Sequence, residues 1–251
     1  MPQNGKIDLL FGIHSVFEAI QAKKRKLHEL LISEKKLTAR LDKIIQAAKK
    51  DHIKIEYANT DLLDKLTKNA RHQGIVAKAS VFPVQNAVEV VSFMEKKQEP
   101  CFILVVENME DPHNLGALIR TALCAGVDCI MIPKDRSVTP SPSVSRSSAG
   151  AMEHANIFMI TNTATILRTL KKKNTWVAGL DARGDTPLYK SDLRGDLVLV
   201  IGGEHKGIRP LVRKECDFLI SIPMSGTVNS LNASVAGGIE IYEAHRQRTL
   251  K

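Results

Sequence analysis

Two short apolar runs near the end of the chain, each followed by a loop of turn-forming residues, most constrain its fold. The first run, Val198 to Ile201, leads into G-G-E-H-K-G-I-R-P, and the second, Phe218 to Ile222, leads into P-M-S-G-T-V-N-S-L-N. Apolar, β-branched runs of this length that end in turn residues are typical of buried parallel strands. The small residues that follow predict a helix from Ser230 to Gln247 that packs closely against another backbone.

The two loops that leave these strands are the predicted ligand site. In open α/β sheets, ligands bind at the carboxyl ends of parallel strands. Gly202, Gly203 and Gly207 would let a flat ligand approach the main chain. The first loop is not a phosphate loop, because Ile208 follows Gly207 where a lysine is required, and the dinucleotide spacing G-x-G-x-x-G is absent. A nucleotide-dependent oxidoreductase is therefore disfavoured.

The length and composition indicate a globular protein of one large or two smaller domains. The 251 residues contain no apolar run that approaches the roughly 18 residues of a membrane helix. The beginning of the chain also lacks the apolar segment of a signal peptide. The four cysteines form no C-x-x-C pair, and the eight histidines show no metal-ligand spacing. We therefore expect a cytoplasmic protein with reduced thiols, no metal and no membrane segment.

The positive charge of the chain is concentrated in its first third. Residues 1–80 hold 16 Lys and Arg against 9 Asp and Glu, whereas the remaining 171 residues hold 20 against 18. A basic excess favours a polyanionic partner such as RNA, through neutralisation of phosphates and release of counterions. A basic surface that serves only solubility is the alternative, and charge alone does not separate the two.

Residues 7–80 alternate between strand-like and helix-like segments and predict a small α/β domain. We place an RNA-binding substrate domain at residues 1–80, a linker with a connecting helix at 81–98, and a second domain at 99–251. Many basic residues of the first domain fall at predicted helix ends and loops: Lys23, Lys24, Arg25, Lys26, Lys35, Lys36, Lys49 and Lys50. Solvated helix ends use the same residues, so no single one of them establishes RNA binding.

The segment E-N-M-E-D-P-H-N-L-G-A-L-I-R-T-A predicts the first strand end and first helix of the second domain. We expect Asn114 to cap a helix that runs to about Ala125. Arg120 lies six residues further along, and its side chain is long enough to reach back toward the strand ends. The alternatives are a plain helix cap for Asn114 and a surface ion pair for Arg120. The later Ser- and Pro-rich segment, from Lys134 to His154, predicts a mobile polar loop.

Three of these segments together resemble a known family. The patterns N-x-x-D-P-x-N-x-G-x-x-x-R-T-A (108–122), I-G-G-E-x-x-G (201–207) and I-P-M-x-G-x-V-x-S-L-N-x-S-V-A (222–236) are similar to the three motifs of the SpoU/TrmH ribose 2′-O-methyltransferases of the SPOUT superfamily. Each pattern alone is weak, but their order and spacing together are specific. The early segments F-G-I-H-S-V-F-E-A-I and R-H-Q-G-I-V-A are similar to the substrate-binding domain found in the rRNA branch of this family.

The resemblance implies a parallel-sheet α/β domain whose last segment is threaded into a deep trefoil knot, preceded by a domain like a small ribosomal RNA-binding protein. It also implies a homodimer packed through the knotted region. The implied activity is S-adenosylmethionine-dependent methylation of a ribose, on a guanosine of 23S rRNA, without a metal.

The resemblance also assigns roles to individual residues. Asn114 and Arg120 would act on the nucleotide, Glu204 would orient the arginine, and Ser230, Asn232 and Ser234 would shape the pocket. The residues expected to bind the cofactor are Gly202, Gly203, Gly207, Ile222, Met224 and Leu231. A guanidinium rarely loses its proton, so we expect Arg120 to stabilise the developing alkoxide while a substrate phosphate or water takes the proton.

Two alternatives to this function remain open. The same chemistry on tRNA is the nearer one, and the first domain argues against it. The other is a non-catalytic RNA-binding or ribosome-assembly protein, which the joint presence of Asn114, Arg120, Glu204 and Asn232 disfavours.

Overall fold

The computed structural model describes residues 7–34, 38–204, 206–227 and 230–249. Lys35 and Lys36, and the motif positions His205, Val228 and Asn229, lie outside the described residues. Contacts within the chain divide it into two units, residues 1–83 with 140–154, and residues 84–139 with 155–251. The segment Pro140–His154, which the sequence places in the second domain, therefore packs with the first unit.

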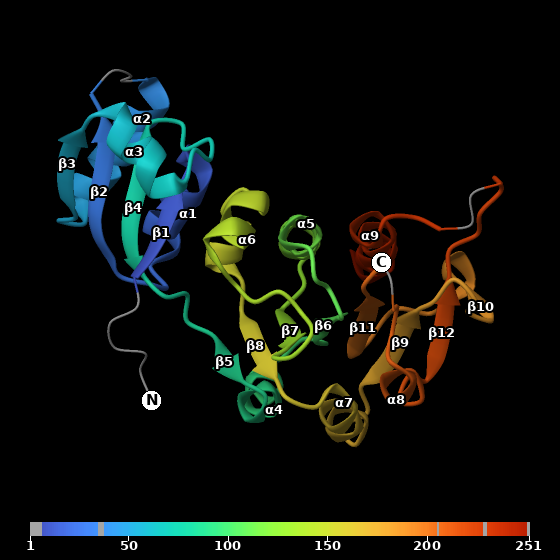
Figure 1. Ribbon diagram of the computed structural model, residues 1–251. Coiled ribbons are helices and arrows are strands. Elements are labelled where there is room, and N and C mark those ends of the chain that lie inside the picture. Colours follow the sequence, from blue (N-terminus) through green and yellow to red (C-terminus); the bar gives the residue numbers. More distant parts are fainter. Residues whose placement is uncertain (1–6, 35–37, 205, 228–229, 250–251) are drawn as a thin grey trace. The chain divides into compact units, whose positions relative to one another are not determined.

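The first unit is a four-stranded sheet with helices on both faces (Figure 1). Its elements in chain order are β1 (Ile7–Phe11), α1 (Ile13–Ala22), β2 (Leu27–Ser33), α2 (Ala39–Lys50), β3 (Lys54–Ala58), α3 (Thr60–Thr67), β4 (Ile75–Ser80), α6 (Pro142–Ser147) and the short 3₁₀ helix η1 (Ala151–His154). The strand order is β1-β4-β2-β3, and only β2 and β3 are parallel. Successive residues of a strand face opposite sides, so Leu30 and Ile32 pack with α1 and α2 while Leu31 packs with Leu63 of α3.

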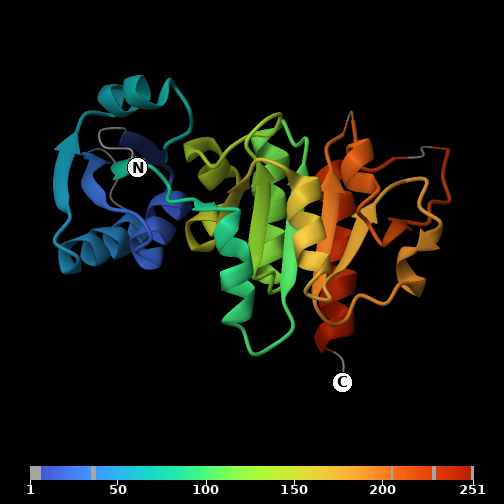
Figure 2. The same cartoon turned by 90° about the horizontal axis from the view of Figure 1, so that it is seen from below.

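The second unit is an eight-stranded sheet in which every pairing is parallel. Its elements are β5 (Gln85–Asn86), α4 (Val88–Glu95), β6 (Phe102–Glu107), α5 (Pro112–Cys124), β7 (Cys129–Pro133), β8 (Ile157–Ile160), α7 (Thr163–Lys171), β9 (Trp176–Leu180), β10 (Thr186–Pro187), η2 (Leu188–Lys190), β11 (Leu197–Gly202), α8 (Pro210–Arg213), β12 (Phe218–Ser221) and α9 (Ala233–Thr249). Helices α4 and α7 cover one face and α5 and α9 the other, as Figures 1 and 2 both show. This confirms the predicted parallel α/β domain.

The strand order of this sheet indicates where a ligand would bind. The order is β10-β12-β9-β11-β6-β7-β8-β5, so β6, β7 and β8 run outward in one direction from a centre at which β11 lies beside β6. Strands β9, β12 and β10 lie on the other side of β11. The loops after β6 and β11 therefore leave the sheet side by side at a point where the strand order reverses, which is where open α/β sheets bind ligands. Strand order does not specify how the last segment is threaded, so the knot stays a prediction of the resemblance.

Three local predictions are wrong. Helix α5 begins at Pro112 and its N-cap is Asp111, whose side chain accepts from the His113 N–H at 2.9 Å, so Asn114 lies inside the first turn. Proline is favoured at the first helical position, and this moves the helix start ahead of Asn114. The expected mobile loop after Lys134 contains α6 and η1. The last helix begins at Ala233 and not at Ser230.

Among the described residues, no helix has the length and apolar character needed to cross a bilayer.

Candidate active site

The glycines after β11 are required by close approach of two backbones. A Cβ added to Gly203 would lie 2.0 Å from the carbonyl oxygen of Asn108, and one added to Gly202 would lie 2.3 Å from the carbonyl carbon of Gly207. Gly207 also has a φ of 55°, in the left-handed region that favours glycine. Asn108 donates from Nδ2 to the Gly207 carbonyl at 3.0 Å. The first and second motifs are thus held together at the sheet edge.

Asn114, Glu204 and Asn232 form a hydrogen-bonded network that contains one residue from each of the three motifs. Glu204 Oε1 accepts from Asn114 Nδ2 at 2.8 Å and from Asn232 Nδ2 at 2.6 Å. Asn232 Nδ2 also donates to Asn114 Oδ1 at 3.1 Å. Glu204 therefore orients the two asparagines, whereas the sequence analysis expected it to orient Arg120.

Asn232 also has a structural role at the start of α9. Its Oδ1 accepts from the backbone N–H of Ser234 at 2.9 Å and of Val235 at 3.3 Å, and from Ser234 Oγ at 2.6 Å. The residue caps α9 with its oxygen while its amide nitrogen binds Glu204. The start of the last helix is thereby fixed to the loop after β11.

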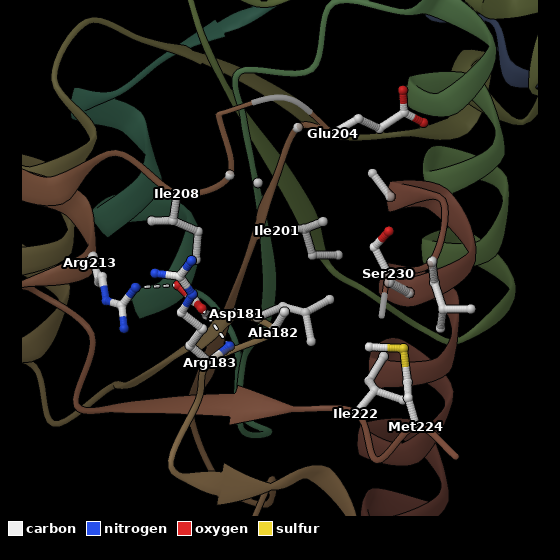
Figure 3. Close-up of a pocket in the computed structure, with 17 residues that line it drawn as sticks. Asp181, Ala182, Arg183, Ile201, Glu204, Ile208, Arg213, Ile222, Met224 and Ser230 are labelled. Atoms are coloured by element: carbon white, nitrogen blue, oxygen red, sulfur yellow. Dashed lines mark hydrogen bonds and ion pairs between the residues drawn. The ribbon is translucent and has the colours of Figure 1, made fainter. Parts of the chain in front are cut away.

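A cavity of about 510 Å³ opens beside this network (Figure 3). Its lining includes all six residues predicted to bind a cofactor: Gly202, Gly203, Gly207, Ile222, Met224 and Leu231. Glu204 and Ser230 line it as well. Ligand pockets commonly measure about 300 to 1,000 Å³ and combine apolar walls with a few polar groups. The cavity is suited to a small organic ligand held largely by backbone and apolar contacts.

A second hollow, of about 360 Å³, adjoins the cavity at Glu204, which lines both. Its lining comes from the loop after β6 and the start of α5, with Asn114, Glu204 and Lys206. Because Glu204 lines both spaces, its network lies between them. Two hollows that share a polar junction suit a reaction in which a group moves from one ligand to another.

Among the predicted catalytic residues, Arg120 lies apart from the network of Asn114, Glu204 and Asn232. It is exposed on α5, lines neither hollow, and forms no hydrogen bond or ion pair with any residue in the described part of the chain. Six residues of helix separate it from Asn114, a rise of about 9 Å. Within one copy of the chain, Arg120 is therefore not part of the network.

An ion pair between the partly exposed Arg209 and the buried Glu107 was not predicted from the sequence. Arg209 donates from Nε and Nη2 to the Glu107 carboxylate at 2.6 and 2.9 Å, and Thr163 Oγ1 also donates to it. The Glu107 side chain is fully buried, and the hydrogen bond to it raises the pKa of the Arg209 guanidinium. Since Glu107 ends β6 and Arg209 follows the loop after β11, this pair fixes the two loops from below.

The charged residues Asp181, Arg183 and Arg213 on one wall of the larger cavity were also missed. The sequence analysis interpreted 181–184 only as a turn. Its position directly after β9 was the available signal, because the loop at that end of the strand reaches the same edge of the sheet as the loop after β11. Among the described residues, no group of three or more His, Cys, Asp or Glu side chains is placed to hold a metal ion.

A parallel α/β sheet with a ligand cavity at its switch point, and a network that joins the three sequence motifs, fits a transferase that takes its group from a small-molecule donor. The sequence profile of the SpoU rRNA Methylase family matches residues 101–242, and that of the domain described as RNA 2′-O ribose methyltransferase substrate binding matches residues 9–84. The chain belongs to the SpoU rRNA methylase family.

Relatives of the chain are similar over nearly its whole length. The 23S rRNA (guanosine-2′-O-)-methyltransferase RlmB of Shewanella oneidensis is 40% identical over 97% of this chain and 98% of that protein. The putative TrmH family tRNA/rRNA methyltransferase YacO of Bacillus subtilis is 39% identical over 96% of each. Among solved structures, an RNA 2′-O ribose methyltransferase is 26% identical, with a TM-score of 0.79 over 97% of this chain and 90% of that one. The SpoU methyltransferase AviRb of Streptomyces viridochromogenes, solved with AdoMet, shares the fold at 21% identity, with a TM-score of 0.80 over 96% of this chain and 90% of that one.

Proposed function

We propose that this protein transfers a methyl group from S-adenosylmethionine to the ribose 2′-oxygen of a guanosine in 23S rRNA. The observation that carries the proposal is the Asn114–Glu204–Asn232 network, which joins the three motifs between two hollows. The relatives of 35 to 40% identity that carry the 23S rRNA guanosine name support the substrate.

The larger cavity suits the cofactor. Gly202 and Gly203 offer uncovered backbone, and a side chain would collide with Gly207 of the same loop at Gly202 and with Asn108 of the loop after β6 at Gly203. Ile222, Met224 and Leu231 form an apolar wall for the adenine. When bound, S-adenosylmethionine supplies an electrophilic methyl group on its sulfonium, a chemistry that needs no metal. The part of this chain is to bind the two substrates and align them.

The smaller hollow is where we place the target nucleotide. Asn114 lies at its edge, held by Glu204 and Asn232, so its amide is fixed relative to the cavity. Fixing the 2′-hydroxyl in line with the reacting group removes much of the entropic barrier, an effect that reaches about 7 to 11 kcal/mol in well-oriented systems. A substrate phosphate or water accepts the 2′-hydroxyl proton.

The homodimer belongs to this proposal. Helices α5 and α9 pack together and leave an exposed stripe in which Val235 and Tyr242 are 50% and 47% exposed. Cys124 is also exposed, on α5. Gly237 keeps α9 close to α5, because a Cβ there would lie 2.7 Å from Leu118 Cδ2. Such a stripe is suited to a second copy of the chain. Arg120 is exposed on the same helix pair, so we place it in the partner's active site, where its charge would stabilise the developing alkoxide.

The first unit is the proposed RNA-binding part. It matches the substrate-binding domain and carries most of the chain's net positive charge. An rRNA substrate also places the protein in the cytoplasm. A tRNA substrate is the second candidate, favoured by the relative named as a tRNA/rRNA methyltransferase.

The test is methyl transfer in vitro from labelled S-adenosylmethionine, in excess chelator, to transcribed 23S rRNA and, separately, to mixed tRNA. The proposal expects label on a guanosine ribose of 23S rRNA, and none with the Asn114→Ala variant. Label only on tRNA selects the second candidate. Transfer that depends on added metal, or the absence of label on both RNAs, refutes the proposal.

A further inference from the structure

One wall of the larger cavity carries an unbalanced positive charge. Asp181 Oδ2 accepts from Arg213 Nη1 at 2.5 Å, and Asp181 Oδ1 accepts from the backbone N–H of Arg183 at 2.8 Å. The Arg183 guanidinium is exposed and has no hydrogen-bond or ion-pair partner among the described residues. Asp181 is thus neutralised by Arg213, and Arg183 leaves the wall with one excess positive charge.

The side of the cavity opposite these charged residues is mainly apolar. Figure 3 shows Asp181, Arg183 and Arg213 together on one side, and Ile222, Met224 and Ser230 across from them. The only other carboxylate in the lining is Glu204, which binds the two asparagines. A ligand with an apolar aromatic part and a single anionic group would complement both walls.

We propose that Arg183 binds the carboxylate of the amino-acid half of the cofactor, and that the Asp181–Arg213 pair positions it. This inference rests on the proposed function, in which S-adenosylmethionine occupies the cavity. A guanidinium presents donors in a planar fork that matches a carboxylate, and such charge-assisted bonds are stronger than neutral ones. Arg213 prevents Asp181 from pairing with Arg183, and the Arg183 N–H bond fixes the loop after β9.

An RNA phosphate is the other anion that a free arginine could bind. The position of Arg183 favours the cofactor, because the residue lines the cavity of the glycine loops and not the hollow that contains Asn114. The experiment separates the two by changing the cofactor and leaving RNA out.

Calorimetry of the full-length protein with two cofactors provides the test. S-adenosylmethionine is compared with decarboxylated S-adenosylmethionine, which keeps the adenosine and the sulfonium but lacks the carboxylate. Wild type is compared with Arg183→Ala and with the matched control Arg194→Ala. Arg194 is an exposed arginine that pairs with Asp192 and does not line the cavity. The Arg183 side chain has no partner among the described residues, so its removal should leave the fold intact.

We expect Arg183→Ala to lose the preference of the protein for S-adenosylmethionine over its decarboxylated form. Wild type and Arg194→Ala should bind S-adenosylmethionine about tenfold more tightly than the decarboxylated form, the order of one charge-assisted bond. Arg183→Ala should bind S-adenosylmethionine about tenfold more weakly than wild type and the decarboxylated form within about twofold of wild type. Arg213→Met should also reduce the preference, because Asp181 is then free to pair with Arg183.

Other outcomes overturn the inference in distinguishable ways. If Arg183→Ala lowers the affinity for both cofactors equally, or for neither, Arg183 does not bind the carboxylate. If it leaves both cofactor affinities unchanged and lowers only the affinity for an rRNA fragment, Arg183 is a phosphate contact. If wild type binds neither cofactor, the cavity is not the cofactor site, and the proposed function fails along with this inference.

Discussion

Glu204 binds the asparagine of each of the other two motifs. The effect of these two hydrogen bonds can be measured separately from the effect of its negative charge. Both asparagines donate to the same oxygen, Oε1. Glutamine keeps that oxygen as an acceptor, whereas alanine removes it. Because hydrogen bonds to charged groups contribute about 1.5 to 3 kcal/mol each, and Glu204 is exposed, we take the lower value for each bond.

We therefore predict that Glu204→Ala lowers the single-turnover rate of methyl transfer about a hundredfold, and that Glu204→Gln lowers it less than about tenfold. Rates are measured on one rRNA fragment with saturating cofactor. Equal losses in the two variants would mean that the charge matters and the positioning of Asn114 and Asn232 does not.

We predict that Arg120→Ala lowers the rate of methyl transfer and leaves the affinity for the cofactor unchanged. Removing one preorganised donor at a developing oxyanion typically costs about 3 to 4 kcal/mol, or a factor of roughly a hundred to a thousand in rate. Arg120 lines neither hollow, so Arg120→Ala should bind the cofactor as wild type does in calorimetry. An exposed surface ion pair would instead contribute about 0 to 1 kcal/mol to stability and nothing to rate. A variant that methylates within about threefold of wild type would make Arg120 a surface residue.

Mixing Arg120→Ala with Asn114→Ala tests whether Arg120 acts across the dimer. If it acts in the partner's site, a mixed dimer contains one site with both residues intact, and activity should return. If it acts in its own subunit, both sites of the mixed dimer stay defective.

At the scale of single elements, α9 carries a buried carboxyl that should make stability depend on pH. Glu240 is fully buried, and neither carboxyl oxygen has a hydrogen-bond partner among the described residues. Burial raises the pKa of Glu240 well above its ordinary value. A group whose pKa is raised by folding contributes stability that is present below its unfolded pKa and is lost as pH rises toward the folded one.

Glu240→Gln should therefore raise the melting temperature of the second unit at pH 8 by more than about 2 °C, and the gain should shrink toward pH 5. A shift of this size corresponds to about 1 kcal/mol in a chain of this length. Glu243, on the same helix, is the matched control, because its hydrogen bond from Arg246 lowers its pKa. Glu243→Gln should lower the melting temperature at pH 8, with a loss that shrinks as the pH falls through the lowered pKa of Glu243. A Glu240→Gln gain that does not change with pH would contradict the account.

Local patterns predicted the strands and the glycine loops well, because each depends on neighbouring residues. All six cofactor positions line one cavity since they follow strands whose carboxyl ends share an edge. Arg183 gave the same kind of signal, because it follows β9, which pairs with β11. Arg213 could not be found in this way, because it ends α8 and reaches the cavity wall through its bond to Asp181, a contact between distant segments. The capping role given to Asn114 failed because Asp111 followed by Pro112 is a stronger helix start.

At the scale of the whole molecule, the two units are interleaved along the chain. The segment Pro140–His154 leaves the second unit and packs with the first, where the Arg25 and Glu153 side chains are buried together. Arg25 donates to Glu153 at 2.5 and 2.7 Å, and Ser145 Oγ donates to the same carboxylate at 2.6 Å. Arg25 and Glu153 lie 128 residues apart, and local sequence patterns do not reveal such a contact, so the Ser- and Pro-rich segment was expected to be mobile.

We predict that Glu153→Ala destabilises the first unit by about 3 kcal/mol, the lower end of the range for a broken buried ion pair, because the buried Arg25 loses Glu153 but keeps its ion pair with Asp8. Glu18, which pairs with His154 in a partly exposed position, is the control, and Glu18→Ala should cost about 0 to 1 kcal/mol. Thermal unfolding measures both, and hydrogen exchange over residues 140–154 should speed up only in Glu153→Ala. Similar stabilities for the two variants would show that the buried pair does not anchor the segment.

The most direct test of the central claim is a map of ribose 2′-O-methylation in 23S rRNA from cells that lack this protein. The account predicts that one guanosine loses its methyl group, that wild type restores it, and that Glu204→Ala, expressed at the same level, does not. A 23S rRNA methylation pattern that is unchanged when the protein is absent would contradict the account.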